Sequence, residues 1–139
     1  NKFNEMRSVL HSIVVILGLA TVGCQAQSVS TGVVNMDVNV ADFAAGIDTT
    51  DNALVLDVRT DAEFASGHLN GATQLDFYRD DFEEALIKLD KDQPVYVYCR
   101  SGNRSGKAAK QMKALGFKEV YNLEGGIGAW ARRGQPIAK

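Results

Sequence analysis

The sequence predicts an α/β domain built on an open parallel sheet. Strand-like and helix-like stretches alternate from residue 33 onward, and this alternation is typical of parallel strands joined by right-handed helical crossovers. Residues 53–58 form a nearly continuous apolar run, as expected for a strand that is buried on both faces. In such sheets the functional site lies at the carboxyl ends of the strands.

The first elements follow from a short apolar stretch, a capping residue and the apolar run. Residues 33–36 predict a short first strand. Asn39 can cap a helix that continues to Ala45, because its side-chain oxygen can accept a hydrogen bond from an amide of the first turn. The run at 53–58 then predicts the second strand, with Asp57 near its end.

A second capping residue, Thr60, predicts the next helix. An acidic first turn follows it through Phe64, and Gly67 is expected to end this short helix. Residues 72–75 predict a short strand. Apolar residues then recur at helical spacing over 82–89, which predicts a helix with one apolar face.

The remaining elements alternate in the same way. Residues 94–98 are rich in valine and tyrosine, which favour strands. A helix is expected over 105–115, closed by Gly116, and a strand over 119–123. A final helix is expected over 129–133.

An export segment is expected before the domain. Arg7 precedes the apolar run at 13–20, and small residues follow up to Ala26, which is the pattern of a secretory signal. The apolar run is too short to span a bilayer comfortably. The chain is therefore interpreted as a signal peptide at 1–26, a linker at 27–32 and one domain at 33–137. The domain is expected to be exported to the periplasm or secreted.

Two alternatives stay open in this segment. Residues 1–5 precede Met6, a candidate start, and are either native or derived from cloning. Residues 21–24 resemble a degenerate bacterial lipoprotein box, in which Cys24 would be lipidated and would anchor the protein to a membrane. After simple cleavage Cys99 is the one cysteine of the mature chain, which excludes an internal disulfide framework.

The segment from Cys99 to Ser105 carries the main functional prediction. It follows a strand and precedes a helix, so successive backbone amides can turn inward and form an anion-binding nest. Gly102 permits the unusual dihedral angles of such a loop. The amides, the helix dipole, Arg100 and Arg104 all favour a thiolate, so we predict a lowered pKa for Cys99. Without this setting, a cysteine at a strand end would be a buried, inert core residue.

Other chemistries are excluded by spacing and composition. Gly102 and Gly106 lie one residue too close for a P-loop, and 126–128 lacks the third glycine of a dinucleotide-binding turn. One cysteine and one histidine in the mature chain do not make a zinc pattern. The net charge of −2 gives no reason to expect a nucleic-acid partner. No metal and no cofactor are expected.

Four motifs in order resemble the rhodanese family, specifically its small single-domain exported members. They are an Asp-Val-Arg segment, a Gly-His-x-x-Gly-Ala turn, the cysteine loop and a Gly-Gly closing segment, at 57–64, 67–72, 99–104 and 123–130. The resemblance covers about residues 33–137. It implies a five-stranded parallel sheet flanked by helices on both faces.

The resemblance also implies two-step sulfur transfer. Cys99 would attack the sulfane sulfur of a donor such as thiosulfate and become a persulfide, and an acceptor such as cyanide or a thiol would remove the outer sulfur. The expected partners are a small donor and acceptor, with a thiol protein as a further candidate. A monomer is expected.

Each site residue has an expected role. The backbone amides of the loop would cradle the persulfide, with Arg100 as the ligand of a substrate anion and Arg104 as a brace. Asp57 either hydrogen-bonds turn amides or orients the loop, and His68 either holds its turn or acts in catalysis. Trp130 is expected in the core, and Arg59 is expected to pair with Glu63. The substrate-binding and persulfide-binding set is Arg100, Ser101, Gly102, Asn103 and Arg104.

Loop length separates the competing functions. Related phosphatases and arsenate reductases have a seven-residue loop, whereas Cys99 through Arg104 span six residues, and the smaller ring suits a single sulfur atom. The alternatives are a persulfide carrier that serves a protein partner, a phosphatase-like or arsenate-reducing enzyme, and a non-catalytic interaction domain. The presence of Cys99 argues against the last of these.

Overall fold

A computed structural model describes residues 32–139. The signal segment, Cys24 and residues 27–31 of the expected linker lie outside this range. The described chain contains five strands and five helices: β1 (Val34–Val38), α1 (Val40–Thr49), β2 (Leu54–Asp57), α2 (Asp61–Ala65), β3 (Thr73–Gln74), α3 (Phe82–Ile87), β4 (Val95–Tyr98), α4 (Asn103–Ala114), β5 (Glu119–Leu123) and α5 (Gly126–Arg132).

The strands form one parallel sheet in the order β1-β5-β4-β2-β3. The first and last strands in sequence are therefore neighbours, with Val34 opposite Glu119 and Val38 opposite Leu123. β4 lies at the centre of the sheet, which places its carboxyl end in the middle of the edge where functional sites form. The sheet confirms the predicted fold class.

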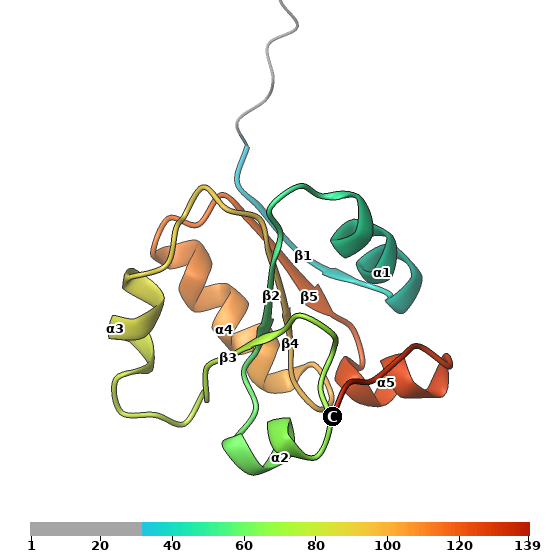
Figure 1. Cartoon of the computed structure of the whole chain (residues 1–139). Helices are drawn as coiled ribbons and strands as arrows, with labels where there is room; N and C mark the ends of the chain where they lie inside the picture. The colour runs from blue at the N-terminus through green and yellow to red at the C-terminus, as the bar shows by residue number, and fades with distance from the viewer. Residues whose placement is uncertain (1–31) are drawn as a thin grey trace, which may run out of the picture.

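Helices cover both faces of the sheet. Figure 1 shows α3 and α4 on one side and α1 and α5 on the other, with α2 beyond the carboxyl ends of the strands. Alternation along β4 sends Val95, Val97 and then Cys99 toward α4, while Tyr96 and Tyr98 point toward α1. Period-two alternation thus gives Cys99 its direction before the loop begins.

The two cores use apolar residues from strands and helices alike. On the α3 and α4 face, helix residues such as Leu86 and Met112 pack against strand residues such as Leu56. On the α1 and α5 face, Phe43 contacts Tyr96 and Trp130 in edge-to-face geometry, with ring centroids 5.3 and 6.1 Å apart. Trp130 is buried, which confirms its expected place in the core.

The helix caps agree with two predictions. The Asn39 side chain accepts a hydrogen bond from the Asp42 amide at 3.0 Å. Thr60 and Glu63 form a reciprocal capping box, in which the Thr60 hydroxyl accepts from the Glu63 amide and the Thr60 amide donates to Glu63. α1 nevertheless runs on to Thr49, beyond the expected end at Ala45.

The two helices nearest the site begin earlier than predicted. α4 starts at Asn103 instead of residue 105, and α5 starts at Gly126 instead of residue 129. Each follows a glycine in the left-handed conformation, Gly102 and Gly125, which takes the N-cap position. A capping side chain is the usual start signal, and neither helix has one.

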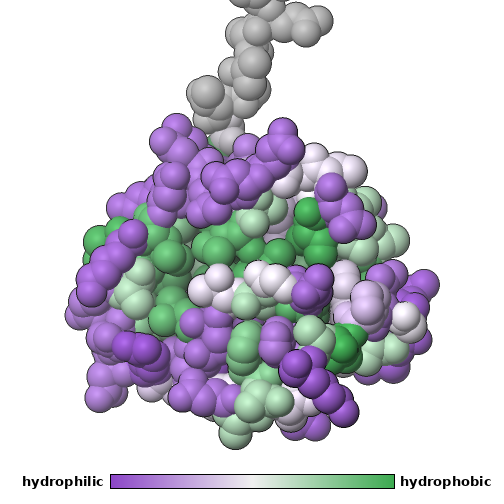
Figure 2. Space-filling view, viewed as in Figure 1, coloured by the Kyte–Doolittle hydropathy of each residue, from purple (hydrophilic) through white to green (hydrophobic). Residues whose placement is uncertain are grey.

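The surface is mainly polar. Figure 2 shows hydrophilic residues around the periphery of one face and hydrophobic residues in a band across its middle. The large apolar side chains that are exposed are Val33, Met36, Tyr78, Ile87 and Ile137. No helix within residues 32–139 has the length and apolar character that crossing a membrane requires.

Candidate active site

Cys99 is the first residue after the central strand and is almost completely buried, with 1% of its surface exposed. The loop that follows turns sharply at Gly102, whose φ is +96°. A Cβ atom at this position would lie 3.3 Å from both the Leu123 carbonyl oxygen and the Gly125 nitrogen. Glycine is therefore required here both by the backbone conformation and by the close approach of the next loop.

Two groups donate hydrogen bonds to the Cys99 sulfur. The Gly102 amide lies 3.1 Å from Sγ, and the Ser105 hydroxyl lies 3.3 Å from it. Burial raises the pKa of Cys99, but hydrogen bonds from the Ser105 side chain and from loop amides outweigh it, so the pKa is lowered from its ordinary value. This direction agrees with the prediction.

The lowered pKa of Cys99 has partly the origin that was expected. Loop amides contribute as predicted, while the largest of the hydrogen bonds that lower the pKa comes from the Ser105 hydroxyl, which was given no role. The charge of Arg104 also interacts with Cys99. The predicted segment ran to Ser105, but the predicted set of binding residues ended at Arg104, so Ser105 was assigned no role. The usable sequence signal was a hydroxyl residue in the first turn of the helix that follows the cysteine, and the structure shows that it is buried.

Arg104 braces the loop against α2. Its guanidinium donates two hydrogen bonds to the Glu63 carboxylate, at 2.7 and 2.8 Å, and its centre lies 5.6 Å from the Tyr78 ring. The hydrogen bond from Arg104 lowers the pKa of Glu63 to about 2, although partial burial acts in the opposite direction. This pair joins the cysteine loop to the helix that the capping box starts.

The predicted ion pair between Arg59 and Glu63 is wrong. Arg59 turns back to Asp57, and its Nη2 lies 2.6 Å from the Asp57 carboxylate and 2.7 Å from the Gly67 carbonyl oxygen. Spacing of four residues favours pairing only within one helix, and Arg59 precedes the helix cap at Thr60. The structure therefore gives Glu63 to Arg104 and Arg59 to Asp57.

Asp57 holds the turn after β2. Its carboxylate accepts hydrogen bonds from the Arg59 backbone amide at 2.9 Å and from the Arg59 side chain. Both residues are buried. Burial, and next a hydrogen bond to Asp57, raise the pKa of Tyr98, which also accepts from the Leu69 amide at 3.0 Å. Asp57 thus organises the loop that lies next to the cysteine loop.

His68 lies in a turn and contacts its own segment. Its Nδ1 is 3.1 Å from the Phe64 carbonyl oxygen, and its ring stacks on Phe64 with centroids 3.9 Å apart. Its backbone pairs with Ala138 in both directions. Within residues 32–139 no hydrogen bond joins its side chain to Cys99. These contacts fit the turn-holding role.

Arg100, Ser101 and Asn103 are exposed around the buried sulfur. Arg100 lines a cavity of about 400 Å³ whose apolar wall includes Ile127 and Ile137. In the part of the chain that the structure describes, Arg100 has no carboxylate within ion-pair distance, whereas the other two charged residues of the cavity, Arg59 and Glu63, are paired. The cavity therefore offers one unneutralised positive charge.

The start of α5 packs against the cysteine loop and holds its backbone. The Ile127 amide donates to the Cys99 carbonyl oxygen at 2.9 Å, and the Gly128 amide donates to the Arg100 carbonyl oxygen at 3.1 Å. Gly126 has a φ of +57°, and a Cβ there would lie 2.6 Å from the Arg100 carbonyl oxygen. In the sequence, Gly125 and Gly126 are identified only as part of a family motif and are assigned no contact with the cysteine loop.

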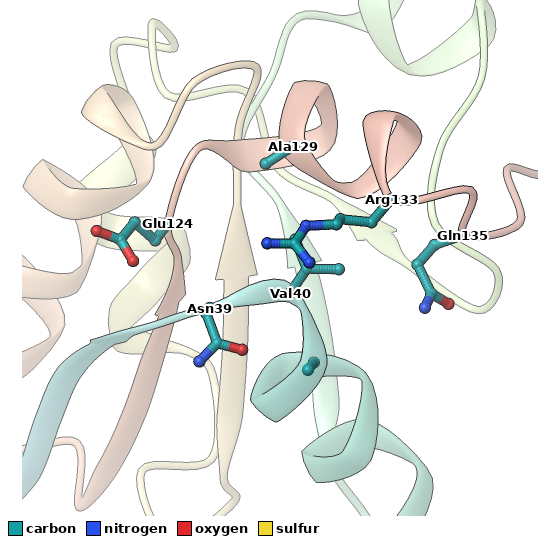
Figure 3. A pocket seen from close by; sticks show the side chains of 7 residues that line it. Asn39, Val40, Glu124, Ala129, Arg133 and Gln135 are labelled. Atoms are coloured by element: carbon teal, nitrogen blue, oxygen red, sulfur yellow. The ribbon is translucent and has the colours of Figure 1, made fainter.

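A second hollow lies on the other side of α5. Figure 3 shows the Arg133 side chain reaching from α5 toward Val40, with Glu124 and Gln135 at the sides. No residue of the cysteine loop lines it. Over residues 32–139, no three His, Cys, Asp or Glu side chains are grouped so that they could hold a metal ion.

Comparisons with known proteins place the chain among relatives of one kind. A family model described as "Rhodanese-like domain" matches residues 39–133. A protein described as a sulfurtransferase from Allochromatium vinosum is 42% identical over 88 residues, covering 63% of this chain and 80% of the relative. A protein described as a thiosulfate sulfurtransferase from Ectopseudomonas mendocina is 37% identical over 81 residues, covering 58% and 72%.

A comparison with solved structures finds a similar fold in a protein of the same kind. A crystal structure described as a rhodanese-related protein from Thermoplasma volcanium superposes with a TM-score of 0.64 at 30% identity. The match covers 73% of this chain and 96% of that one.

Proposed function

The chain belongs to the family of rhodanese-like domains, and from this premise we propose that it transfers a sulfane sulfur from thiosulfate or a similar donor to cyanide or a thiol. The carrier of the sulfur is a persulfide on Cys99. The observation that carries this proposal is the pair of donors, the Gly102 amide and the Ser105 hydroxyl, that converge on a buried sulfur.

The first step is a displacement at sulfur. The Cys99 thiolate attacks the sulfane sulfur of the donor, a new S–S bond forms, and the electron pair of the old S–S bond leaves with sulfite when thiosulfate is the donor. The negative charge moves to the outer sulfur of the persulfide. Loop amides and the Ser105 hydroxyl stabilise the attacking thiolate without a separate base.

The second step returns the enzyme to its thiolate form. A nucleophilic acceptor attacks the outer sulfur, and the electron pair of the persulfide S–S bond returns to Cys99 Sγ. Arg100 binds the anionic end of the donor, because its charge is unpaired beside the loop and a guanidinium binds oxyanions well. The deep burial of Cys99 favours a small donor over the cysteine of a folded carrier protein.

Mass spectrometry tests the persulfide. The purified protein is incubated with thiosulfate and weighed intact, beside the variants Cys99→Ser and Cys24→Ser. We expect the mass of one sulfur atom to be gained by the wild type and by Cys24→Ser, lost in Cys99→Ser, and discharged by cyanide.

Two results would decide against the proposal. A sulfur adduct that persists in Cys99→Ser would assign the chemistry to another group. Hydrolysis of an aryl phosphate without any sulfur adduct would favour the phosphatase-like alternative. Turnover with cyanide compared with thiol proteins separates an enzyme for small acceptors from a relay module.

A further inference from the structure

Asn122 of β5 links the sheet to the cysteine loop. It is 4% exposed and is paired with Val97 of the central strand β4. Its side chain lies beside Gly106 of α4. Its Nδ2 donates to the Asp37 carboxylate at 2.8 Å and to the Gly102 carbonyl oxygen at 3.3 Å. Asp37 belongs to β1, so one amide group connects two strands with the loop.

Gly102 is the residue through which this contact reaches the sulfur. Its amide donates to Cys99 Sγ, and its carbonyl oxygen accepts from Asn122 and from the Gly106 amide. Because glycine has a wide range of φ and ψ angles, the orientation of Gly102 depends on these two contacts to its carbonyl oxygen, one from the helix backbone and one from the Asn122 side chain. Among residues 32–139, Asn122 is the only side chain that donates a hydrogen bond to the Gly102 carbonyl oxygen.

The other end of the Asn122 amide has no partner. Its Oδ1 is buried and receives no hydrogen bond. A buried acceptor without a donor costs stability, so packing alone is a poor account of an asparagine at this position. The Nδ2 contacts with Asp37 and Gly102 give the amide a different purpose.

We propose that Asn122 is a positioning residue that fixes the Gly102 carbonyl and thereby keeps the Gly102 amide directed at Cys99 Sγ. It touches neither substrate nor sulfur and acts through the loop. The role concerns thiol activation and rests on the proposed sulfur transfer only for its effect on turnover.

The variant Asn122→Leu removes the amide and keeps a similar side-chain volume. Asn35→Leu is a matched control, because Asn35 Nδ2 also donates to a backbone carbonyl of α4, at 2.7 Å, but that carbonyl belongs to Ala109 and not to the loop. Thiol reactivity is measured with iodoacetamide against pH in Cys24→Ser backgrounds, and thermal unfolding is measured in parallel.

We expect a higher Cys99 pKa in Asn122→Leu and a thiolate population at neutral pH that falls about tenfold, because the Gly102 amide would lose its hydrogen bond to the thiolate. The melting temperature should stay close to wild type, because the substitution also removes a buried acceptor without a partner. Asn35→Leu should leave the pH profile unchanged.

The outcomes separate this proposal from the function. An unchanged Cys99 pKa in a folded Asn122→Leu variant overturns the positioning role. An equal rise in Asn35→Leu also overturns it, since any loss of packing against α4 would then suffice. Asn122→Ser, which keeps a small donor, provides a second folded variant, and it should fall between wild type and Asn122→Leu. Because alkylation needs no sulfur donor, these readings stand even if no persulfide forms.

Discussion

At the residue scale, the hydrogen bond from the Ser105 hydroxyl to the Cys99 sulfur is the contact that most lowers the pKa of Cys99. Removing it in Ser105→Ala should raise the pKa of Cys99 and reduce sulfur transfer by about tenfold at neutral pH, because one hydrogen bond to the thiolate is lost. The measurement is the pH profile of alkylation together with steady-state turnover.

Thr49→Ala is the control for Ser105→Ala. Thr49 also carries a helical hydroxyl, and this hydroxyl donates to the Ala45 carbonyl oxygen on the exposed surface of α1. Its loss should leave both measurements unchanged. A Ser105→Ala variant with the wild-type pH profile would show that the amides alone set the thiol pKa.

Glu63 leads to a prediction about stability and pH. Its pKa falls from 4.5 to about 2 on folding, so its pairing with Arg104 contributes stability in full above pH 4.5 and loses it as pH falls toward 2. Glu63→Gln should therefore be less stable than wild type at neutral pH, and the difference should shrink as pH falls through this window. Denaturant unfolding at a series of pH values measures it.

Asp81→Asn is a matched control for that pair. Arg79 and Asp81 make an ion pair of similar length, 2.8 Å, but both side chains are more than half exposed. Solvent screening makes such pairs nearly neutral for stability. A pH-dependent loss in Asp81→Asn as large as in Glu63→Gln would contradict the special role of the Glu63 brace.

At the element scale, the start of α5 packs against the backbone of the cysteine loop and donates hydrogen bonds to it. In Gly126→Ala the new Cβ would collide with the backbone carbonyl of Arg100, and the positive φ adds strain. We expect the loop to move, sulfur transfer to fall by at least about a hundredfold, as misplaced catalytic groups cause, and the melting temperature to drop.

Gly134→Ala separates strain from collision. Gly134 has a φ of +71°, and no atom lies within 4 Å of a Cβ placed there. It should lose a little stability and keep its activity, because only the backbone conformation is disfavoured. Comparable activity losses in both variants would contradict the view that the contact between α5 and the cysteine loop is needed for activity.

The elements also show what sequence can predict and why. The five strands and the capped helices were predictable, because apolar runs and capping side chains are local signals. The early starts of α4 and α5 were not, since each follows a left-handed glycine whose meaning depends on a neighbouring loop.

The site divides along the same line. Cys99 and its loop were predictable from the strand–loop–helix setting. The partners of Glu63 and Arg59, and the contacts of Ser105 and Asn122, depend on side chains that meet across the fold. The spacing of residues in the sequence does not reveal such contacts, and for Arg59 it suggested the wrong partner.

At the scale of the whole molecule, one sheet joins two cores. Met112 is fully buried on the α4 face and Phe43 is fully buried on the α1 face. Met112→Ala should destabilise the protein by about 2–5 kcal/mol and Phe43→Leu by about 1 kcal/mol, from lost burial and altered packing. Equilibrium unfolding measures both variants and their combination.

The double variant tests whether the cores act independently. Because the sheet separates the two side chains, their effects should add within about 0.5 kcal/mol, and unfolding should remain one cooperative transition. Two resolved transitions, or a large departure from additivity, would show that the faces unfold separately or are strongly coupled.

The pairing of β1 with β5 has a consequence for the order in which the molecule is completed. The strand at 34–38 has no neighbour in the sheet until the strand at 119–123 has been synthesised. Helix α5, which packs against the cysteine loop, is synthesised later still. During vectorial synthesis the nascent chain therefore carries Cys99 as an ordinary thiol. The contacts that hold the cysteine loop in place form only when nearly the entire domain is available, so the lowered pKa of Cys99 depends on the finished fold as well as on the loop.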